Sequence, residues 1–148
     1  MTEITFTVPM TPVAKARARS TGRGGRHITP SKTRKAEADI ATYATRAMAG
    51  RQPLTGPVEL RLAFYFTPPA SWPASKREKA LRYMAWKISK PDVDNLQKSV
   101  MDAGNGILWK DDSQIAVIGR ITKQYDTAAR IEVAVKAMED WIVSADPK

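Results

Sequence analysis

The chain has 148 residues, enough for one domain over residues 1–148 with a buried core. Its 24 lysines and arginines outnumber its 15 aspartates and glutamates, and the net charge of +9 favours polyanionic partners. The absence of cysteine excludes disulfides, a catalytic thiol and cysteine-based zinc sites, and the single histidine argues against multi-histidine sites. Any metal site would therefore use oxygen ligands, which hard cations prefer. Without a signal-like N-terminus or a bilayer-long apolar run, we expect a cytoplasmic protein and no membrane contact.

The first third of the chain contains one strand pattern, one basic stretch and one helix pattern. Apolar and polar residues alternate over residues 3–8, which predicts a half-buried strand. The stretch over about residues 13–28 is rich in glycine, lysine and arginine and is predicted to be a basic loop. Helical spacing then predicts a helix over 32–48, with Thr29 or Ser31 as its N-cap.

The rest of the chain continues with the same two periodicities. They predict, in order, a strand over 58–66, a short helix over 76–84, an extended stretch over 86–89 and a helix over 94–105. Segments 115–125 and 130–136 both alternate, and we expect them to pair as a β-hairpin around Asp126-Thr127. A closing helix is expected over 137–143. The fold class is α/β (α+β): a single domain with a mixed β-sheet flanked by helices.

An acidic cluster interrupts this basic chain. Its members are Asp92, Asp94, Asp102, Asp111 and Asp112. With Asp94 as the N-cap of the predicted helix, Asp94, Lys98 and Asp102 fall at i, i+4 and i+8 and share one face. Leu96 and Val100 lie on the opposite side, where they can bury. Asp92 precedes the helix, and a loop could return the Asp111-Asp112 pair to its start.

Carboxylates that converge on one point repel one another unless a cation lies among them. Magnesium binds a few carboxylates together with waters and phosphate oxygens, and it can activate water for attack on a phosphate. Lys98 would add positive charge where the transition state gains negative charge. The same spacing is equally compatible with ordinary helix caps, an i,i+4 surface pair and a turn.

Two segments of this cluster resemble the RusA family of Holliday-junction resolvases. They are Lys-Pro-Asp-Val-Asp-Asn-Leu-Gln-Lys at 90–98, followed by Asp102, and Gly-Ile-Leu-Trp-Lys-Asp-Asp-Ser-Gln at 106–114. Residues 12–17 and 29–33 are also similar to that family, so the resemblance covers most of the chain. Its members are small endodeoxyribonucleases often carried by bacteriophages and prophages. The resemblance implies a homodimer that binds four-way DNA junctions and makes paired symmetric nicks in recombination and repair.

The resemblance also implies roles for individual residues. Asp92, Asp94 and Asp112 would be catalytic and would hold Mg²⁺ or Mn²⁺, and Lys98 would be the essential lysine. Asp102 would have a lesser role, and Asp112, not Asp111, would be the catalytic member of its pair. One departure from the family is Gly104, which we expect to loosen the last turn of the helix.

The resemblance explains the excess of basic residues, which would neutralise junction phosphates without reading sequence. The candidate DNA-binding residues are Lys15, Arg17, Arg19, Arg23, Arg26, Lys32, Arg34 and Lys35. His27 is assigned to a loop or to the DNA backbone, and the tryptophans to the core or a dimer interface. Two alternatives stay open: a non-catalytic protein that binds branched DNA, and a nuclease specific for flaps or duplex.

Overall fold

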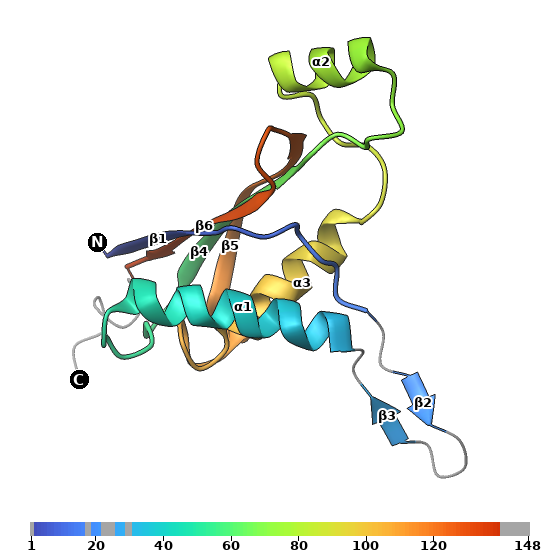
Figure 1. The fold of residues 1–148 in the computed structure, drawn as a ribbon. Helices are drawn as coiled ribbons and strands as arrows, with labels where there is room; N and C mark the ends of the chain where they lie inside the picture. The colour runs from blue at the N-terminus through green and yellow to red at the C-terminus, as the bar shows by residue number, and fades with distance from the viewer. Residues whose placement is uncertain (1, 17–18, 22–25, 29–30, 140–148) are drawn as a thin grey trace, which may run out of the picture.

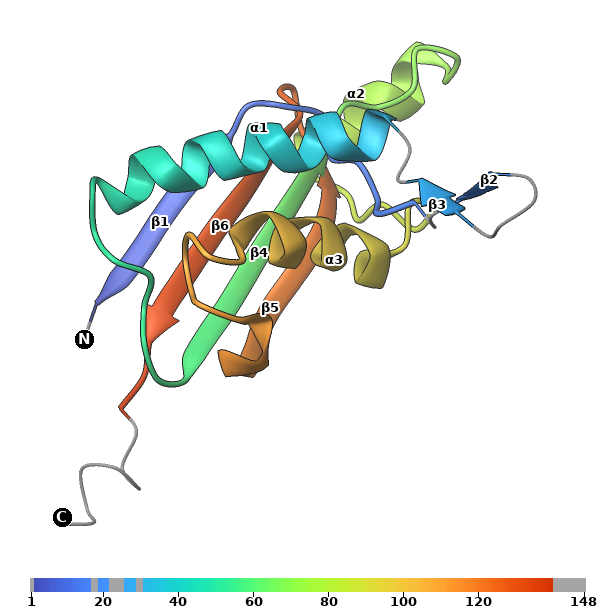
Figure 2. The same ribbon diagram turned by 90° about the horizontal axis from the view of Figure 1, so that it is seen from below.

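The computed structural model describes residues 2–16, 19–21, 26–28 and 31–139, with the backbone alone over 19–21 and 26–28. A four-stranded mixed sheet, in the order β1-β6-β4-β5, forms the centre of the molecule. Its strands are β1 (Glu3–Val8), β4 (Val58–Phe66), β5 (Ile115–Tyr125) and β6 (Arg130–Ala137). Helices α1 (Ser31–Met48) and α3 (Val93–Gly104) lie side by side on one face of this sheet (Figures 1 and 2). The predicted α+β fold with a mixed sheet is confirmed.

The core lies between that face of the sheet and the two helices. Alternate side chains of β4, from Val58 through Leu60 to Phe64, are fully buried beneath the helices. Ile40 of α1 and Leu96 of α3 are buried against them. Burial of side chains of this size stabilises the fold by roughly 1.5–3 kcal/mol each. The opposite face of the sheet carries the polar and small residues of the alternation.

Helix α3 begins one residue earlier than its sequence predicted. Asp92, not Asp94, is the N-cap, and its backbone is extended, with φ −73° and ψ 147°. The side chain of Asp92 accepts no capping hydrogen bond. The predicted apolar side is confirmed, since Leu96 and Val100 are both 0% exposed.

Gly104 ends α3 and allows the chain that follows to pack closely against the helix. A Cβ at this position would lie 2.9 Å from Cζ2 of Trp109 and 3.0 Å from Cδ1 of Leu108. Both of these side chains are fully buried. The indole Nε1 of Trp109 donates a hydrogen bond to Oδ1 of Asn105 at 2.8 Å. Glycine is therefore required where the returning chain packs onto the end of the helix.

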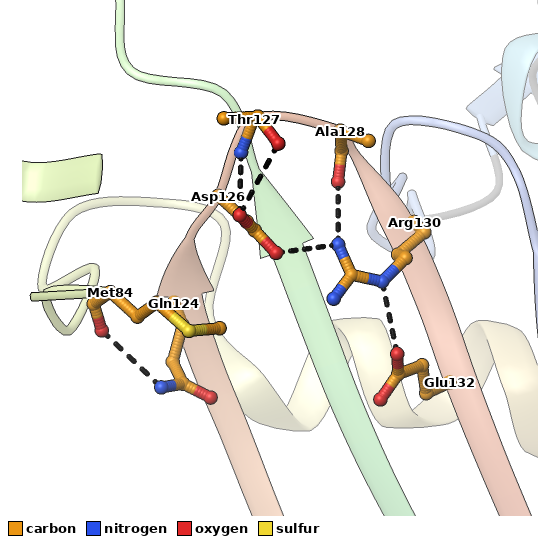
Figure 3. A network of polar contacts seen from close by, with 7 residues as sticks. All are labelled: Met84, Gln124, Asp126, Thr127, Ala128, Arg130 and Glu132. Carbon is orange, nitrogen blue, oxygen red and sulfur yellow. Dashed lines mark hydrogen bonds and ion pairs between the residues drawn. The ribbon is translucent and has the colours of Figure 1, made fainter. Parts of the chain in front are cut away.

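The predicted hairpin of β5 and β6 is wrong, because β4 lies between these two strands. β4 pairs parallel with β5 and antiparallel with β6. The connection over 126–129 passes over the end of β4 (Figure 3). It must span two strand spacings, roughly 10 Å, which four residues can do. The alternating pattern identified β5 and β6 as strands but did not indicate which strands they pair with. Pairing depends on which strand lies between them, and this is β4.

Arg130 stabilises this connection through hydrogen bonds. Its Nη1 donates to Oδ2 of Asp126 at 2.8 Å and to the carbonyl oxygen of Ala128 at 3.0 Å, and its Nε donates to Oε2 of Glu132 at 2.9 Å (Figure 3). Its guanidinium also lies 3.8 Å from the centre of the Tyr65 ring. The hydrogen bond from Arg130, with that from the Thr127 amide, lowers the pKa of Asp126 below 3.8.

The remaining elements differ from the predictions in smaller ways. The basic stretch predicted as a loop contains two short antiparallel strands, β2 (Arg19–Thr21) and β3 (Arg26–Ile28). Helix α2 runs over Ala74–Arg82, and a short 3₁₀ helix, η1, over Asp112–Gln114.

Two further stretches are the predicted extended segment over 86–89 and the predicted helix over 137–143. Trp86 forms a single bridge to Gln124 in the predicted extended stretch. In the predicted closing helix, Ala137 belongs to β6 and residues 138–139 are not helical, while 140–143 lie outside the described residues. No helix in the described part of the chain has the length and apolarity needed to span a bilayer.

Candidate active site and nucleic-acid interface

Two carboxylates stand at the start of α3. Asp92 caps the helix and Asp94 lies in its first turn, and both are exposed, as is Lys98 one turn later. Among the described residues, neither carboxylate takes part in an ion pair. The positive end of the helix dipole favours negative charge at this position. The shared face of Asp94, Lys98 and Asp102 is confirmed by the burial of the opposite side.

The chain leading into α3 is held by a lysine from β5. Nζ of Lys123 donates to the carbonyl oxygens of Ser89 and Pro91, each at 2.8 Å. The peptide bond between Lys90 and Pro91 is cis. Lys123 therefore fixes the residue next to Asp92 against the far end of β5. Sequence patterns gave no signal for this role, because it depends on the tertiary contact between the strand and the loop.

The structure separates the two members of the second acidic pair. Asp111 caps η1, with Oδ2 accepting from the Ser113 amide at 3.1 Å, and this hydrogen bonding lowers its pKa below 3.8. Gln114 completes the capping box and donates through Nε2 to the carbonyl oxygens of Leu54 and Gly56 at 2.9 and 3.0 Å. Asp111 is thus used in the local fold, whereas the half-exposed Asp112 forms no such contact among the described residues.

Asp112 is not brought to the start of α3 within one chain. It is the first residue of η1, which directly precedes β5, whereas Asp92 lies beside Lys123 near the other end of that strand. Eight residues of extended chain separate these two ends by roughly 26 Å. Consistently, the described residues contain no group of three or more acidic or histidine side chains that could hold a metal ion. One copy of the chain therefore lacks the predicted three-carboxylate site.

A hollow of about 420 Å³ lies at the edge of β5 beside the start of α3. Trp86 and Val93 line it together with three basic residues, Lys87, Arg120 and Lys123. The guanidinium of Arg120 lies 5.7 Å from the centre of the Trp86 ring. A basic hollow next to two carboxylates can receive a phosphate or another acidic group.

The predicted DNA-binding residues fall into three groups. Lys15 is engaged, since its Nζ lies 2.7 Å from Oε1 of Glu37 and 3.1 Å from Oδ2 of Asp102. The hydrogen bond to Glu37, with that to Asp102, raises the pKa of Lys15 above 10.5. Lys32, Arg34 and Lys35 are exposed on the first turns of α1, with Lys35 paired to Asp39. The side chains of Arg17, Arg19, Arg23, Arg26 and His27 lie outside the described residues.

Helix α2 was not identified as a basic element from the sequence. Helix α2 places Lys76, Lys79 and Arg82 at i, i+3 and i+6, and all three are exposed. That spacing is visible in the sequence and could have been found by the rule that identified the acidic face of α3.

Comparison with known proteins agrees with these features. The model of the family described as "Endodeoxyribonuclease RusA" matches residues 9–136. The chain is also similar to "Uncharacterized protein YqaN" of Bacillus subtilis (strain 168). The two are 36% identical over 137 residues, which cover 90% of this chain and 95% of that protein. The family match over residues 9–136 includes α3, η1 and all the carboxylates of the candidate site.

Proposed function

Because the chain belongs to the RusA family of endodeoxyribonucleases, we propose that it resolves four-way DNA junctions in recombination and repair by paired symmetric nicks. The observation that carries the proposal is the exposed pair of carboxylates, Asp92 and Asp94, at the start of α3 in a chain of net charge +9. Lys98 lies one turn further along the same face. Exposed carboxylates repel DNA phosphates, and a bound metal ion would turn that repulsion into attraction.

Magnesium or manganese would supply the positive charge that stabilises an attacked phosphate. Asp92 and Asp94 would contribute two of its ligands, and Lys98 would face the same phosphate. The described residues of one copy do not complete the site, because Asp112 lies at the other end of β5. A single chain therefore provides only part of the proposed metal site.

We propose that a homodimer completes the site. Over residues 115–122, β5 has one edge without a strand partner among the described residues, and Ile118 is 48% exposed there. If two β5 edges paired antiparallel about a two-fold axis near Ile118, the start of β5 in one copy would lie beside the end of β5 in the other. Asp112 of the second copy would then approach the basic hollow and Asp92. This interface would also cover the exposed Trp86 and Ile88.

The first test measures cleavage. Labelled four-way junctions, flaps and duplexes are incubated with magnesium or manganese and wild type, Asp94→Asn or Asp39→Asn. We expect symmetric junction nicks with wild type and with Asp39→Asn, a matched exchange on α1 away from the site. Asp94→Asn should bind junctions without cutting them. Binding without cutting by wild type would favour a non-catalytic protein, and preferential cutting of flaps or duplex would favour another specificity.

The second test distinguishes a site shared between two copies from a site within one. Asp94→Asn and Asp112→Asn are co-refolded so that mixed dimers form. If Asp112 acts across the interface, each mixed dimer has one intact site, and about a quarter of the wild-type sites reappear, as single nicks. If both residues act within one copy, every mixed dimer stays inactive.

A further inference from the structure

Helix α2 projects from the rest of the domain and carries none of the candidate catalytic carboxylates. It stands away from the sheet, beyond the end at which α3 begins (Figures 1 and 2). Its attachment is narrow: Ala80 is buried, and the Trp72 ring preceding the helix packs edge-on against Tyr125, with ring centres 5.2 Å apart. The backbone amide of Ala85 donates to the carbonyl oxygen of Ala80 at 2.9 Å. Most of the helix surface is therefore available to a partner.

The exposed surface of α2 is basic on one side. Lys76, Lys79 and Arg82 cover an arc of about 120° on the helix, and all three are exposed. No ion pair among the described residues involves any of them. Nζ of Lys76 lies 3.9 Å from the centre of the Trp72 ring, and Tyr83, the C-cap residue of the helix, is 72% exposed. Glu78 is the single acidic residue of the helix.

The position of α2 relates it to the candidate active site. The β2–β3 hairpin is a second projection, and Figure 1 shows the two on opposite sides of the start of α3. The chain before the hairpin is fixed to α3, because the Lys15 amide donates to the Asn95 carbonyl and Ser99 Oγ donates to the Val13 carbonyl, each at 2.9 Å. Asp92 and Asp94 thus stand between two projections.

We propose that α2 is a DNA-binding arm that contacts the phosphates of one duplex arm of the substrate through Lys76, Lys79 and Arg82. This inference rests on the proposed function, because it names how the same substrate is held. Three exposed cations on one face of a protruding helix can neutralise phosphates of a DNA backbone. Contacts of this kind position DNA without reading its sequence. The arm and the hairpin would hold duplex on both sides of the carboxylates.

The test is binding, measured in the Asp94→Asn protein so that no DNA is cut. Fluorescence anisotropy with a labelled four-way junction gives the affinity over a range of salt concentrations. Lys79→Gln/Arg82→Gln is compared with Arg46→Gln/Arg51→Gln, which removes two exposed charges at the far end of α1. We expect the α2 pair to lower affinity on the order of tenfold and the salt slope by about 1.8, or about 0.9 per lost contact. The control pair should change the slope by less than about 0.5.

The outcomes are distinguishable. If the parent protein does not bind junctions, the proposed function fails. If the Asp94→Asn protein binds with a steep salt dependence and Lys79→Gln/Arg82→Gln does not change that slope, the proposed role of α2 is wrong while the proposed function stands. An equal loss in the control pair would also overturn the arm, since it would reflect net charge alone. Thermal unfolding shows whether each variant is folded. If the double variant is unfolded, the single variants Lys79→Gln and Arg82→Gln are measured instead, and each must lower the salt slope of binding by about 0.9.

Discussion

The start of α3 and the connection between β5 and β6 each hold two carboxylates, but they use them differently. At the connection, Asp126 and Glu132 both accept hydrogen bonds from Arg130. At the start of α3, Asp92 and Asp94 are exposed and take part in no ion pair among the described residues. The first group stabilises a turn that crosses a strand, and the second contributes nothing comparable to the fold. Unpartnered acidic residues in a basic protein are therefore the better candidates for chemistry.

The largest effect should come from Asp92→Asn, which tests the functional side of this comparison. The Asp92 side chain makes no capping hydrogen bond, and asparagine is as favourable as aspartate at an N-cap, so the fold should be retained. If Asp92 binds the metal as proposed, its loss should slow junction cleavage at least about a hundredfold, roughly 3 kcal/mol of transition-state stabilisation. Single-turnover cleavage rates and urea unfolding measure the two quantities. A destabilised variant with normal cleavage per folded molecule would make Asp92 structural.

The reverse pattern is expected for Arg130→Met. The substitution removes three hydrogen bonds and leaves the carboxylates of Asp126 and Glu132 without their cation. We expect the free energy of unfolding to fall by about 2 kcal/mol, with cleavage per folded molecule unchanged. Lys136→Met, on the same strand, serves as the matched control. A loss of cleavage without a loss of stability would remove the distinction between the two regions.

The same contrast explains how far the sequence could predict the molecule. Local patterns located β1, β4, β5, β6, α1 and α3 to within about two residues, because alternation and helical spacing are local properties. They also selected Asp94, Lys98 and Asp102 as one exposed face. The pairing of β5 and β6 was wrong, because β4 comes from far earlier in the chain and takes the place between them.

The candidate site shows the same limit. The motif over 90–98 identified Asp92 and Asp94, and the structure keeps them together because they are two residues apart. The placement of Asp112 depends on the length and direction of β5, which no local pattern encodes. The roles of Lys123 and Lys15 also arise from tertiary contacts, with partners 32 and 22 residues away.

Asp126→Asn should have a smaller effect on the free energy of unfolding, and this effect should depend on pH. The pKa of Asp126 is lowered in the folded protein, so its stabilisation is present above the unfolded value near 3.8 and is lost as pH falls through the folded pKa. At pH 7 the substitution should cost about 1 kcal/mol. The difference from wild type should shrink as the pH falls below 3.8. Urea unfolding at several pH values measures it, and a difference independent of pH would contradict the pairing with Arg130.

The smallest effect is expected from Lys15→Met, which asks whether a paired cation can also bind DNA. Lys15 joins the chain before the hairpin to Glu37 of α1 and Asp102 of α3. Its raised pKa means that this stabilisation is present below pH 10.5 and is lost as pH rises through the folded pKa. Because the pairs are partly exposed, the loss at pH 7 should be about 0.5–1 kcal/mol. Arg34→Gln, which removes an exposed cation of α1, should lower the salt slope of junction binding by about 0.9, whereas Lys15→Met should leave it unchanged. An equal fall in the salt slope for Lys15→Met and Arg34→Gln would mean that Lys15 leaves its two carboxylates to contact a phosphate. An ion pair in the free protein would then not be enough to mark a charged residue as structural.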